Sequence, residues 1–192
     1  MLLARTFASN LSSWELLRKA LSEFGSDSGL FKDIEIRRWS TKERGPFQIR
    51  IKVSGTGHNL VDVGYGVSQV LPVLVESIKS PNGATILLQQ PEVHLHPKAQ
   101  ASLGSVLLAL SKSQNKTFIV ETHSDYLVDR IRMDVRDNED LSPSDVSILF
   151  FERKKGDVII HPISIDKRGN MVGAPRAFRR FFLEEEKRFL LG

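Results

Sequence analysis

The sequence predicts an α/β protein with a parallel sheet flanked by helices and an antiparallel hairpin at the edge of that sheet. From Ser68 onward, apolar runs of strand length alternate with helical stretches of about 10–15 residues, which implies parallel strands joined by right-handed crossovers. Two later β-rich runs, 146–152 and 157–163, are separated by a short glycine-containing turn, which favours an antiparallel pair. With 192 residues the chain has about the length of one ordinary domain.

The N-terminal part predicts one helix and two strands. Apolar residues recur at helical spacing from Trp14 to Phe24, and Ser12 or Ser13 can cap this helix. Residues 25–29 consist of glycine, serine and aspartate, so the helix is expected to end there. Alternating apolar and polar residues then predict strands at 34–36 and 47–53, followed by a loop at 54–66.

The rest of the chain predicts helices that alternate with strands, then the hairpin and a last helix. Pro72 is expected inside the first turn of its helix, where proline is tolerated. The expected order is a helix at 67–78, a strand at 85–90, a helix at 97–113, a strand at 116–121, a helix at 124–133, the hairpin, and a charged helix at 175–191.

The composition is that of a globular protein, with 41% hydrophobic and 26% charged residues. No apolar run approaches the roughly 20 residues that span a bilayer, so we expect a cytoplasmic protein without a membrane segment. The absence of cysteine excludes disulfides and thiolate metal sites. The net charge of +4 leaves nucleic-acid binding open, although basic residues alternate with acidic ones, which favours a mixed, solvated surface.

Two segments of the chain predict groups that handle phosphates. Residues 62–69 form a loop that opens a helix and contains Gly64, Gly66 and Ser68, and backbone N–H groups at such a helix start can bind an anion. The strand at 85–90 delivers Gln89-Gln90-Pro91-Glu92 at its carboxyl end, where open α/β sheets build ligand sites. In phosphoryl transfer, acidic residues at this position hold Mg²⁺ and orient the attacking water.

Two further segments follow in a fixed order. His94-Leu95-His96-Pro97 makes a turn into the next helix. The strand at 116–121 ends in Glu121-Thr122-His123-Ser124, and a histidine just beyond a parallel strand can reach a γ-phosphate. The alternative is an ordinary turn in which Thr122 or Ser124 caps the following helix.

This ordered set resembles the second half of the head domain of ABC/SMC-like AAA-type ATPases. These proteins are related to the overcoming-lysogenization-defect (OLD) and RecF-like ATPases and often carry a DUF3696-type C-terminus. The resemblance covers roughly Asp62 to the end of the chain, and the segments at 62–74 and 87–100 are quite specific to the group. It implies a P-loop NTPase-like fold, the ABC-ATPase head, here incomplete, with ATP and Mg²⁺ as cofactors.

The resemblance also implies roles for single residues. Gly64, Gly66 and Ser68 would belong to the signature loop, which contacts the nucleotide on the opposite protomer. Gln89 falls at the Walker B acid that holds the metal, and Gln90 falls at the catalytic glutamate. The remaining positions are the D-loop at 94–96 and the switch histidine, His123.

The chain departs from the family pattern because it contains no G-x-x-x-x-G-K-[ST] motif. We therefore expect the C-terminal half of an ATPase, with residues 1–60 as a remnant of the preceding lobe, 61–166 as the second half of the core, and 167–192 as a helical extension. A missing P-loop strand would leave the strands at 85–90 and 116–121 with an unpaired edge. The chain is then expected to be marginal alone, or to dimerise through that edge.

The second departure is the pair Gln89-Gln90. Glutamine accepts a hydrogen bond and can position water, but it is neither a carboxylate base nor a full counter-charge for Mg²⁺. Glu92 is a candidate substitute for the base. Its alternative role, as a structural residue of the D-loop, is the one favoured by its place in the motif.

Three functional hypotheses follow. The first is an ATPase of DNA-related or anti-phage processes, inactive as a single chain, that needs a P-loop-bearing segment or protein, or a homodimer, with DNA as a candidate partner. The second is a non-catalytic ATPase relic that binds a protein or a nucleic acid. The third is a metal-dependent hydrolase that uses His94, His96 and His123, and the resemblance disfavours it because it explains these positions without metal ligation.

Overall fold

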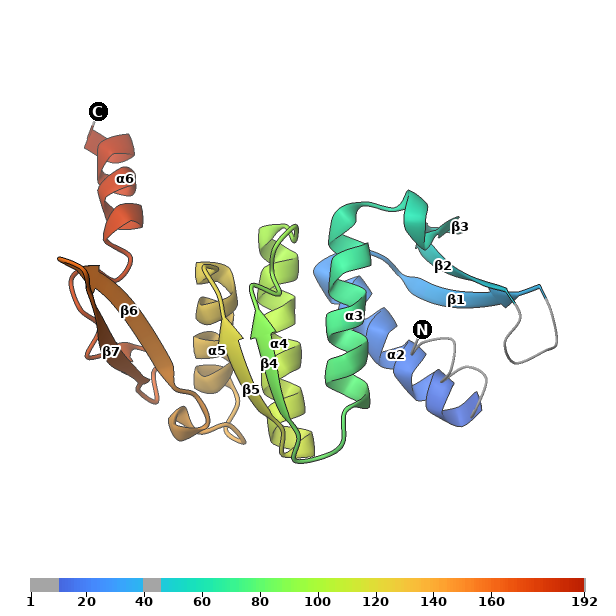
Figure 1. Cartoon of the computed structure of the whole chain (residues 1–192), viewed down its shortest axis with the longest axis horizontal. Helices are drawn as coiled ribbons and strands as arrows, with labels where there is room; N and C mark the ends of the chain where they lie inside the picture. The colour runs from blue at the N-terminus through green and yellow to red at the C-terminus, as the bar shows by residue number, and fades with distance from the viewer. Residues whose placement is uncertain (1–10, 40–45, 192) are drawn as a thin grey trace. The chain divides into compact units, whose positions relative to one another are not determined.

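The computed structural model describes residues 11–39 and 46–191. The chain divides into two compact units, Met1–Ile131 and Arg132–Gly192. Figure 1 shows the helices and strands with the labels used below.

The first described element of unit 1 is helix α2, Leu11–Ser28. The apolar stripe predicted for this helix is confirmed, because Trp14, Leu21 and Phe24 are buried in the core. The predicted end within residues 25–29 is confirmed, because the helix ends at Ser28, although it runs through Gly25. A Cβ on Gly25 would lie 2.4 Å from the ring of Phe31, so this glycine allows close packing within the unit rather than ending the helix.

An antiparallel sheet follows, in the order β1 (Asp33–Arg38), β2 (Phe47–Ser54) and β3 (Thr56–Asn59). Ile34 and Ile51 face each other in the first strand pair and are fully buried. The predicted loop at 54–66 is wrong in its first half, because it contains β3 and the short 3₁₀ helix η1, Leu60–Asp62. The sequence TGHN of β3 has no apolar alternation, so no pattern indicated a strand there.

Arg18 on α2 and Asp33 on β1 join the first helix to the first strand. The Arg18 Nε donates to Asp33 Oδ1 at 2.8 Å, a second guanidinium nitrogen donates to Oδ2, and Ser22 Oγ also donates to Oδ1. The hydrogen bonds from Arg18 lower the pKa of Asp33 below its ordinary value of 3.8, and the backbone N–H of Ile34 adds to this effect. The folded state therefore favours the ionised carboxylate.

We expect Asp33→Asn to destabilise the protein by about 1–2 kcal/mol at pH 7, a modest value because Arg18 is partly exposed to solvent. The folded-state pKa of Asp33 is lowered, so the contribution is fully present above pH 3.8 and is lost as the pH falls through the folded-state value. Urea denaturation of both proteins at pH 7 and near pH 3 measures this. An equal difference in stability at the two pH values would contradict the assignment.

The helices of unit 1 pack around α4, Pro97–Gln114. Helix α3 spans Tyr65–Lys79, and α5 (Asp125–Asp137) begins in unit 1. Helix α3 starts before the predicted Val67, and Pro72 lies in its middle rather than in its first turn. Proline has no N–H, so the carbonyl of Ser68 lacks its usual helical partner, and the exposed position of Pro72 lets water take that place.

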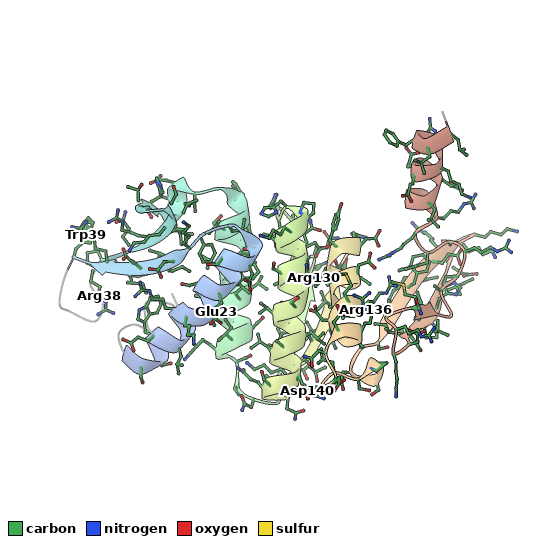
Figure 2. The ribbon with its side chains drawn as sticks, turned by 180° about the vertical axis from the view of Figure 1, so that it is seen from behind. Glu23, Arg38, Trp39, Arg130, Arg136 and Asp140 are labelled. Atoms are coloured by element: carbon green, nitrogen blue, oxygen red, sulfur yellow. The ribbon has the colours of Figure 1, made fainter. Side chains whose placement is uncertain are left out.

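The predicted parallel sheet is confirmed as the pair β4 (Thr85–Gln89) and β5 (Thr117–Glu121). In Figure 1 the strands lie in front of α4 and α5, and in Figure 2, seen from behind, these helices lie in front. One face, with Leu88, Phe118 and Val120, packs against the core. On the other face Leu87 is 75% exposed and Ile119 is 56% exposed, so this face is uncovered in the part of the chain described.

Unit 2 contains the end of α5, the 3₁₀ helix η2 (Pro143–Asp145) and a three-stranded antiparallel sheet. The predicted hairpin is confirmed, with Lys155 and Gly156 at positive φ in its turn. Its strands form a sheet of their own with a short third strand that was not predicted. The strands are β6 (Ile148–Lys154), β7 (Asp157–Ile165) and β8 (Met171–Val172), and the last helix is α6 (Arg180–Leu191), which begins after the predicted residue 175.

Candidate functional site

The carboxyl end of the parallel pair brings Gln89 beside Glu121. The two residues are register partners at the ends of β4 and β5, and both are exposed. Gln90 lies just beyond β4 with φ of 44°, and its N–H donates to the carbonyl of Glu121 at 2.8 Å. A residue with an amide and one with a carboxylate are therefore paired at this end of the sheet, and the sequence had assigned no role to Glu121.

The segment from Pro91 to His96 turns the chain from β4 into α4. The N–H of Leu95 donates to the carbonyl of Glu92 at 2.9 Å, and His94 has φ of 71°. Leu95 is buried, whereas His94 and His96 are exposed. His96 is the N-cap of α4, and its carbonyl accepts the N–H of Ala99 at 2.9 Å.

Glu92 is the buried acidic side chain of this turn, with only 6% of its surface exposed. Its Oε1 accepts the hydroxyl of Thr122 at 2.6 Å and the backbone N–H of His123 at 2.9 Å. Its Oε2 is buried and has no hydrogen-bond partner among the residues described. Glu92 therefore ties the loop after β4 to the loop after β5.

A second link between the two loops runs through α4. Gln100 donates from Nε2 to the carbonyl of Leu95 at 2.8 Å, and its Oε1 accepts the hydroxyl of Ser124 at 2.6 Å. Ser124 Oγ also accepts the N–H of Leu127 at 3.0 Å, so Ser124 caps α5 as one of the two predicted candidates. Gln100 was not predicted, although its place in the first turn of α4 is a signal that its side chain can reach back to the preceding loop.

The amino end of α3 packs on the turn after β4. A Cβ on Gly66 would lie 2.8 Å from the carbonyl oxygen of His94, so only glycine fits at this position. The rings of Tyr65 and His94 lie beside each other, with centroids 5.5 Å apart. The predicted signature segment is thus in contact with the predicted D-loop.

The start of α3 itself is open. Gly64 is its N-cap, offers no side-chain cap, and has no atom within 4 Å of the place where a Cβ would lie. Ser68 Oγ donates to the carbonyl of Tyr65 at 3.0 Å and is engaged within the first turn. The backbone N–H groups of such an uncapped helix start can bind an anion.

The histidines do not assemble a metal site in the part of the chain that the structure describes. No group of three or more His, Asp and Glu side chains there could hold a metal ion, so His94, His96 and His123 do not come together in that way. The geometry gives no support to the hypothesis of a metal-dependent hydrolase.

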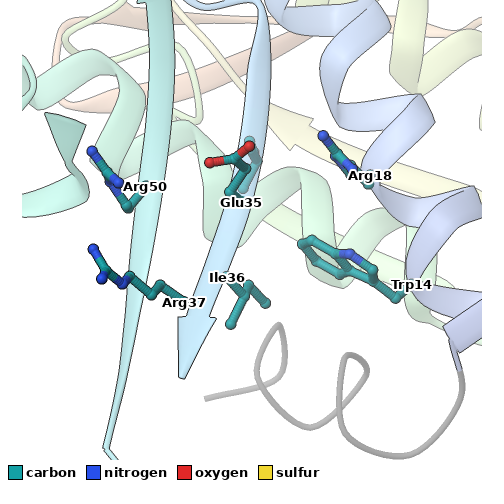
Figure 3. Close-up of a pocket in the computed structure, with 7 residues that line it drawn as sticks. Trp14, Arg18, Glu35, Ile36, Arg37 and Arg50 are labelled. Carbon is teal, nitrogen blue, oxygen red and sulfur yellow. The ribbon is translucent and has the colours of Figure 1, made fainter. Parts of the chain in front are cut away.

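A separate hollow lies between α2 and the strands β1 and β2 (Figure 3). Arg18 is paired with Asp33, and a guanidinium nitrogen of Arg50 donates to the carbonyl of Gly57 at 2.6 Å. These two arginines therefore stabilise the fold of unit 1. The hollow includes none of the loops after β4 and β5 and is lined by Trp14, Arg18, Ile34, Glu35, Ile36, Arg37 and Arg50.

The chain matches the family model described as AAA ATPase domain over residues 3–128. This region includes the N-terminal helix and the first sheet, where the sequence offered no functional motif, and it ends before the hairpin. No curated protein matches the chain. No helix among the described residues is long and apolar enough to cross a membrane.

Several solved structures share the fold. An SMC ATPase studied for ATP-driven dimerization and DNA-stimulated activation is 15% identical, with a TM-score of 0.55 over 92% of this chain and 94% of that one. An SMC head bound to the C-winged helix domain of ScpA is 13% identical, with a TM-score of 0.59 over 82% of this chain and 45% of that one. An SMC head with an extended coiled coil, bound to the C-terminal domain of ScpA and derived from Pyrococcus furiosus, is 14% identical. Its TM-score is 0.57 over 93% of this chain and 39% of that one.

Sequence identities this low show that the folds are similar and nothing more. The fold is that of SMC ATPase heads, which confirms the predicted P-loop NTPase-like α/β class. The chain spans less than half the length of two of these three structures.

Proposed function

The chain belongs to the AAA ATPase domain family, and from that premise we propose that it is part of an ABC/SMC-like ATPase whose nucleotide site is completed by a P-loop-bearing segment or protein. ATP is bound and hydrolysed only in that complete site, and the single chain is inactive. The process is DNA-related or anti-phage, and the subgroup is that of the OLD- and RecF-like ATPases with a DUF3696-type C-terminus.

The observation that carries this proposal is the uncovered parallel pair β4–β5. Parallel sheets are normally covered on both faces, yet Leu87 and Ile119 are exposed on one face here. The sequence also contains no G-x-x-x-x-G-K-[ST] motif to hold phosphates. A P-loop-bearing strand and helix would both extend this sheet and supply the missing phosphate loop.

The residues at the carboxyl end of the pair fit Mg-ATP. Mg²⁺ prefers oxygen ligands, and Gln89 and Glu121, which carry an amide and a carboxylate, are register partners at the ends of β4 and β5. Glu121 can therefore supply the negative charge that glutamine at position 89 lacks. Gln90 would orient the attacking water and His123 would contact the γ-phosphate, as the resemblance implies.

The open start of α3 fits a second phosphate contact. Gly64 leaves space in front of the helix, and Gly66 and Ser68 lie in its first turn. In this proposal the segment contacts the nucleotide held by the partner's P-loop. Mg²⁺ supplies charge stabilisation for phosphoryl transfer, while this chain holds the phosphate and positions the switch loop.

We expect Mg-ATP to bind only when a P-loop-bearing polypeptide is present. Isothermal calorimetry of Mg-ATP with the pure chain, alone and mixed with a P-loop-bearing protein encoded beside it, measures this. Binding only in the mixture supports the shared site. Binding by the single chain, or no binding in either sample, would overturn it.

One specific observation favours a second function, the non-catalytic relic. Both predicted acidic positions are glutamines, and Glu92 is buried away from solvent. A relic would bind a protein or a nucleic acid without nucleotide. For a relic, the heat of binding to its partner should be the same with and without Mg-ATP. The same calorimetry measures this heat.

A further inference from the structure

We propose that Glu92 is a positioning residue, which holds the loop that carries His123 in place and does not act on water itself. This inference rests on the proposed function for the role of His123 at a phosphate. Its structural part, the control of the His123 loop by Glu92, is tested independently below.

The first support is the pair of hydrogen bonds at one carboxylate oxygen. Glu92 Oε1 accepts the Thr122 hydroxyl at 2.6 Å and the His123 backbone N–H at 2.9 Å. Both donors belong to the loop after β5, so a single oxygen fixes the backbone on which the His123 side chain is mounted. Two hydrogen bonds to one oxygen restrain this backbone together.

The second support is a closed circuit of hydrogen bonds, which we call the Glu92 ring. It runs from Glu92 through Thr122 to Ser124, whose N–H donates to Thr122 Oγ1 at 3.0 Å. Ser124 donates to Gln100, Gln100 donates to the carbonyl of Leu95, and the N–H of Leu95 donates back to the carbonyl of Glu92. The ring therefore joins β4's loop, α4 and β5's loop into one hydrogen-bonded unit, in which each group restricts the others.

Burial argues against a direct catalytic role for Glu92. A general base must lie within hydrogen-bond reach of the water it deprotonates. Glu92 is 6% exposed, its Oε1 is already engaged twice, and its Oε2 is enclosed without a partner among the described residues. Side chains that do reach solvent at this end of the sheet include those of Gln89, Glu121 and His123.

The choice of variants follows from these contacts. Glu92→Ala removes the acceptor and leaves two donors inside the protein without a partner. Glu92→Gln keeps one oxygen that can accept both donors. Thr122→Val removes one donor and leaves the His123 N–H bonded to Glu92, so it serves where Glu92→Ala does not fold.

Amide hydrogen exchange by NMR on the single chain tests the structural part. We expect the His123 amide to exchange about tenfold faster or more in Glu92→Ala, beyond any change at core amides such as those of α4, and Glu92→Gln to restore most of the protection. Thr122→Val should give a smaller increase confined to the same loop. A His123 exchange rate that is unchanged, or that rises only in step with the whole of unit 1, would overturn the proposal.

Matched controls come from exposed residues of the same type. Glu76 lies on the exposed side of α3, and Thr117 lies on the uncovered face of β5. Glu76→Ala and Thr117→Val should leave the exchange of the His123 amide unchanged. An equal effect of these controls would show that the loop responds to any substitution in unit 1, which contradicts the proposal.

A double-mutant cycle in the mixture with the P-loop-bearing protein tests the link to chemistry. Glu92→Ala should lower kcat for ATP hydrolysis and change KM little, and it should cost almost nothing further when His123 is already alanine. Additive losses would contradict a role through His123. If the mixture hydrolyses no ATP, the proposed function fails, while the exchange experiment still decides whether Glu92 holds the loop.

Discussion

Replacing Leu87 and Ile119 together by lysine is expected to abolish assembly with the P-loop-bearing partner while leaving the single chain folded. Both side chains are largely exposed on the uncovered face of β4–β5, at 75% and 56%, so the substitution removes little packing within the chain. Exposed substitutions of this kind usually change stability by less than about 0.5 kcal/mol. The effect should therefore appear in assembly and not in folding.

The size of the effect follows from the cost of burying charge. If the partner covers this face, two ammonium groups lose their hydration without an acid opposite them, at several kcal/mol each. The dissociation constant should then rise by about a thousandfold or more. Sedimentation of the mixture measures assembly, and urea denaturation of the single chain measures stability.

The matched control is Leu16→Lys on α2, a substitution of an equally exposed leucine far from the sheet in the chain, at 72%. It should leave assembly unchanged. A double variant that assembles as tightly as the original protein would mean that this face is not the one the partner covers. The same samples show whether the single chain associates with itself through these strands, since lysines on this face oppose that contact too.

The elements that could be predicted were those with a strong apolar period. The stripe from Trp14 to Phe24 and the alternation of β1 and β2 each identify a face that packs on the core, and the structure buries the stripe together with Ile34 and Ile51 of the strands. The errors lie where tertiary contacts override local signals. Gly25 has the local signal of a turn residue, yet it lies inside α2, which ends at Ser28, and the ring of Phe31 occupies the space that a side chain there would need.

The candidate site, like the fold, could be predicted only in part. The spacing of the motifs predicted that the loops after β4 and β5 lie at one end of the parallel pair, and the strand register confirms this. The sequence does not show which group each polar side chain contacts in the folded protein. The sequence left Glu92 as a candidate base or, as its place in the motif favours, a structural residue, and its contacts with Thr122 and His123 could not be foreseen because both belong to another strand's loop.

Gly66→Ala is expected to destabilise the protein by about 1–3 kcal/mol, although alanine is the better helix former. In an open helical position this change would stabilise by about 0.5–1 kcal/mol, because glycine loses more conformational freedom on folding. Here the added Cβ would lie 2.8 Å from the carbonyl oxygen of His94, which is backbone and cannot rotate away. Overpacking of this kind typically costs about 1–3 kcal/mol, enough to reverse the sign.

The consequence reaches the site because α3 is held against the turn after β4 at this point. Moving the start of α3 would separate Tyr65 from His94 and displace the open helix start at Gly64, so nucleotide binding in the mixture should weaken as well. Gly64→Ser is the matched control for stability, since nothing lies within 4 Å of its Cβ and serine is a good N-cap. Urea denaturation of the two variants decides the matter: a stabilised Gly66→Ala protein would show that α3 does not depend on this close contact.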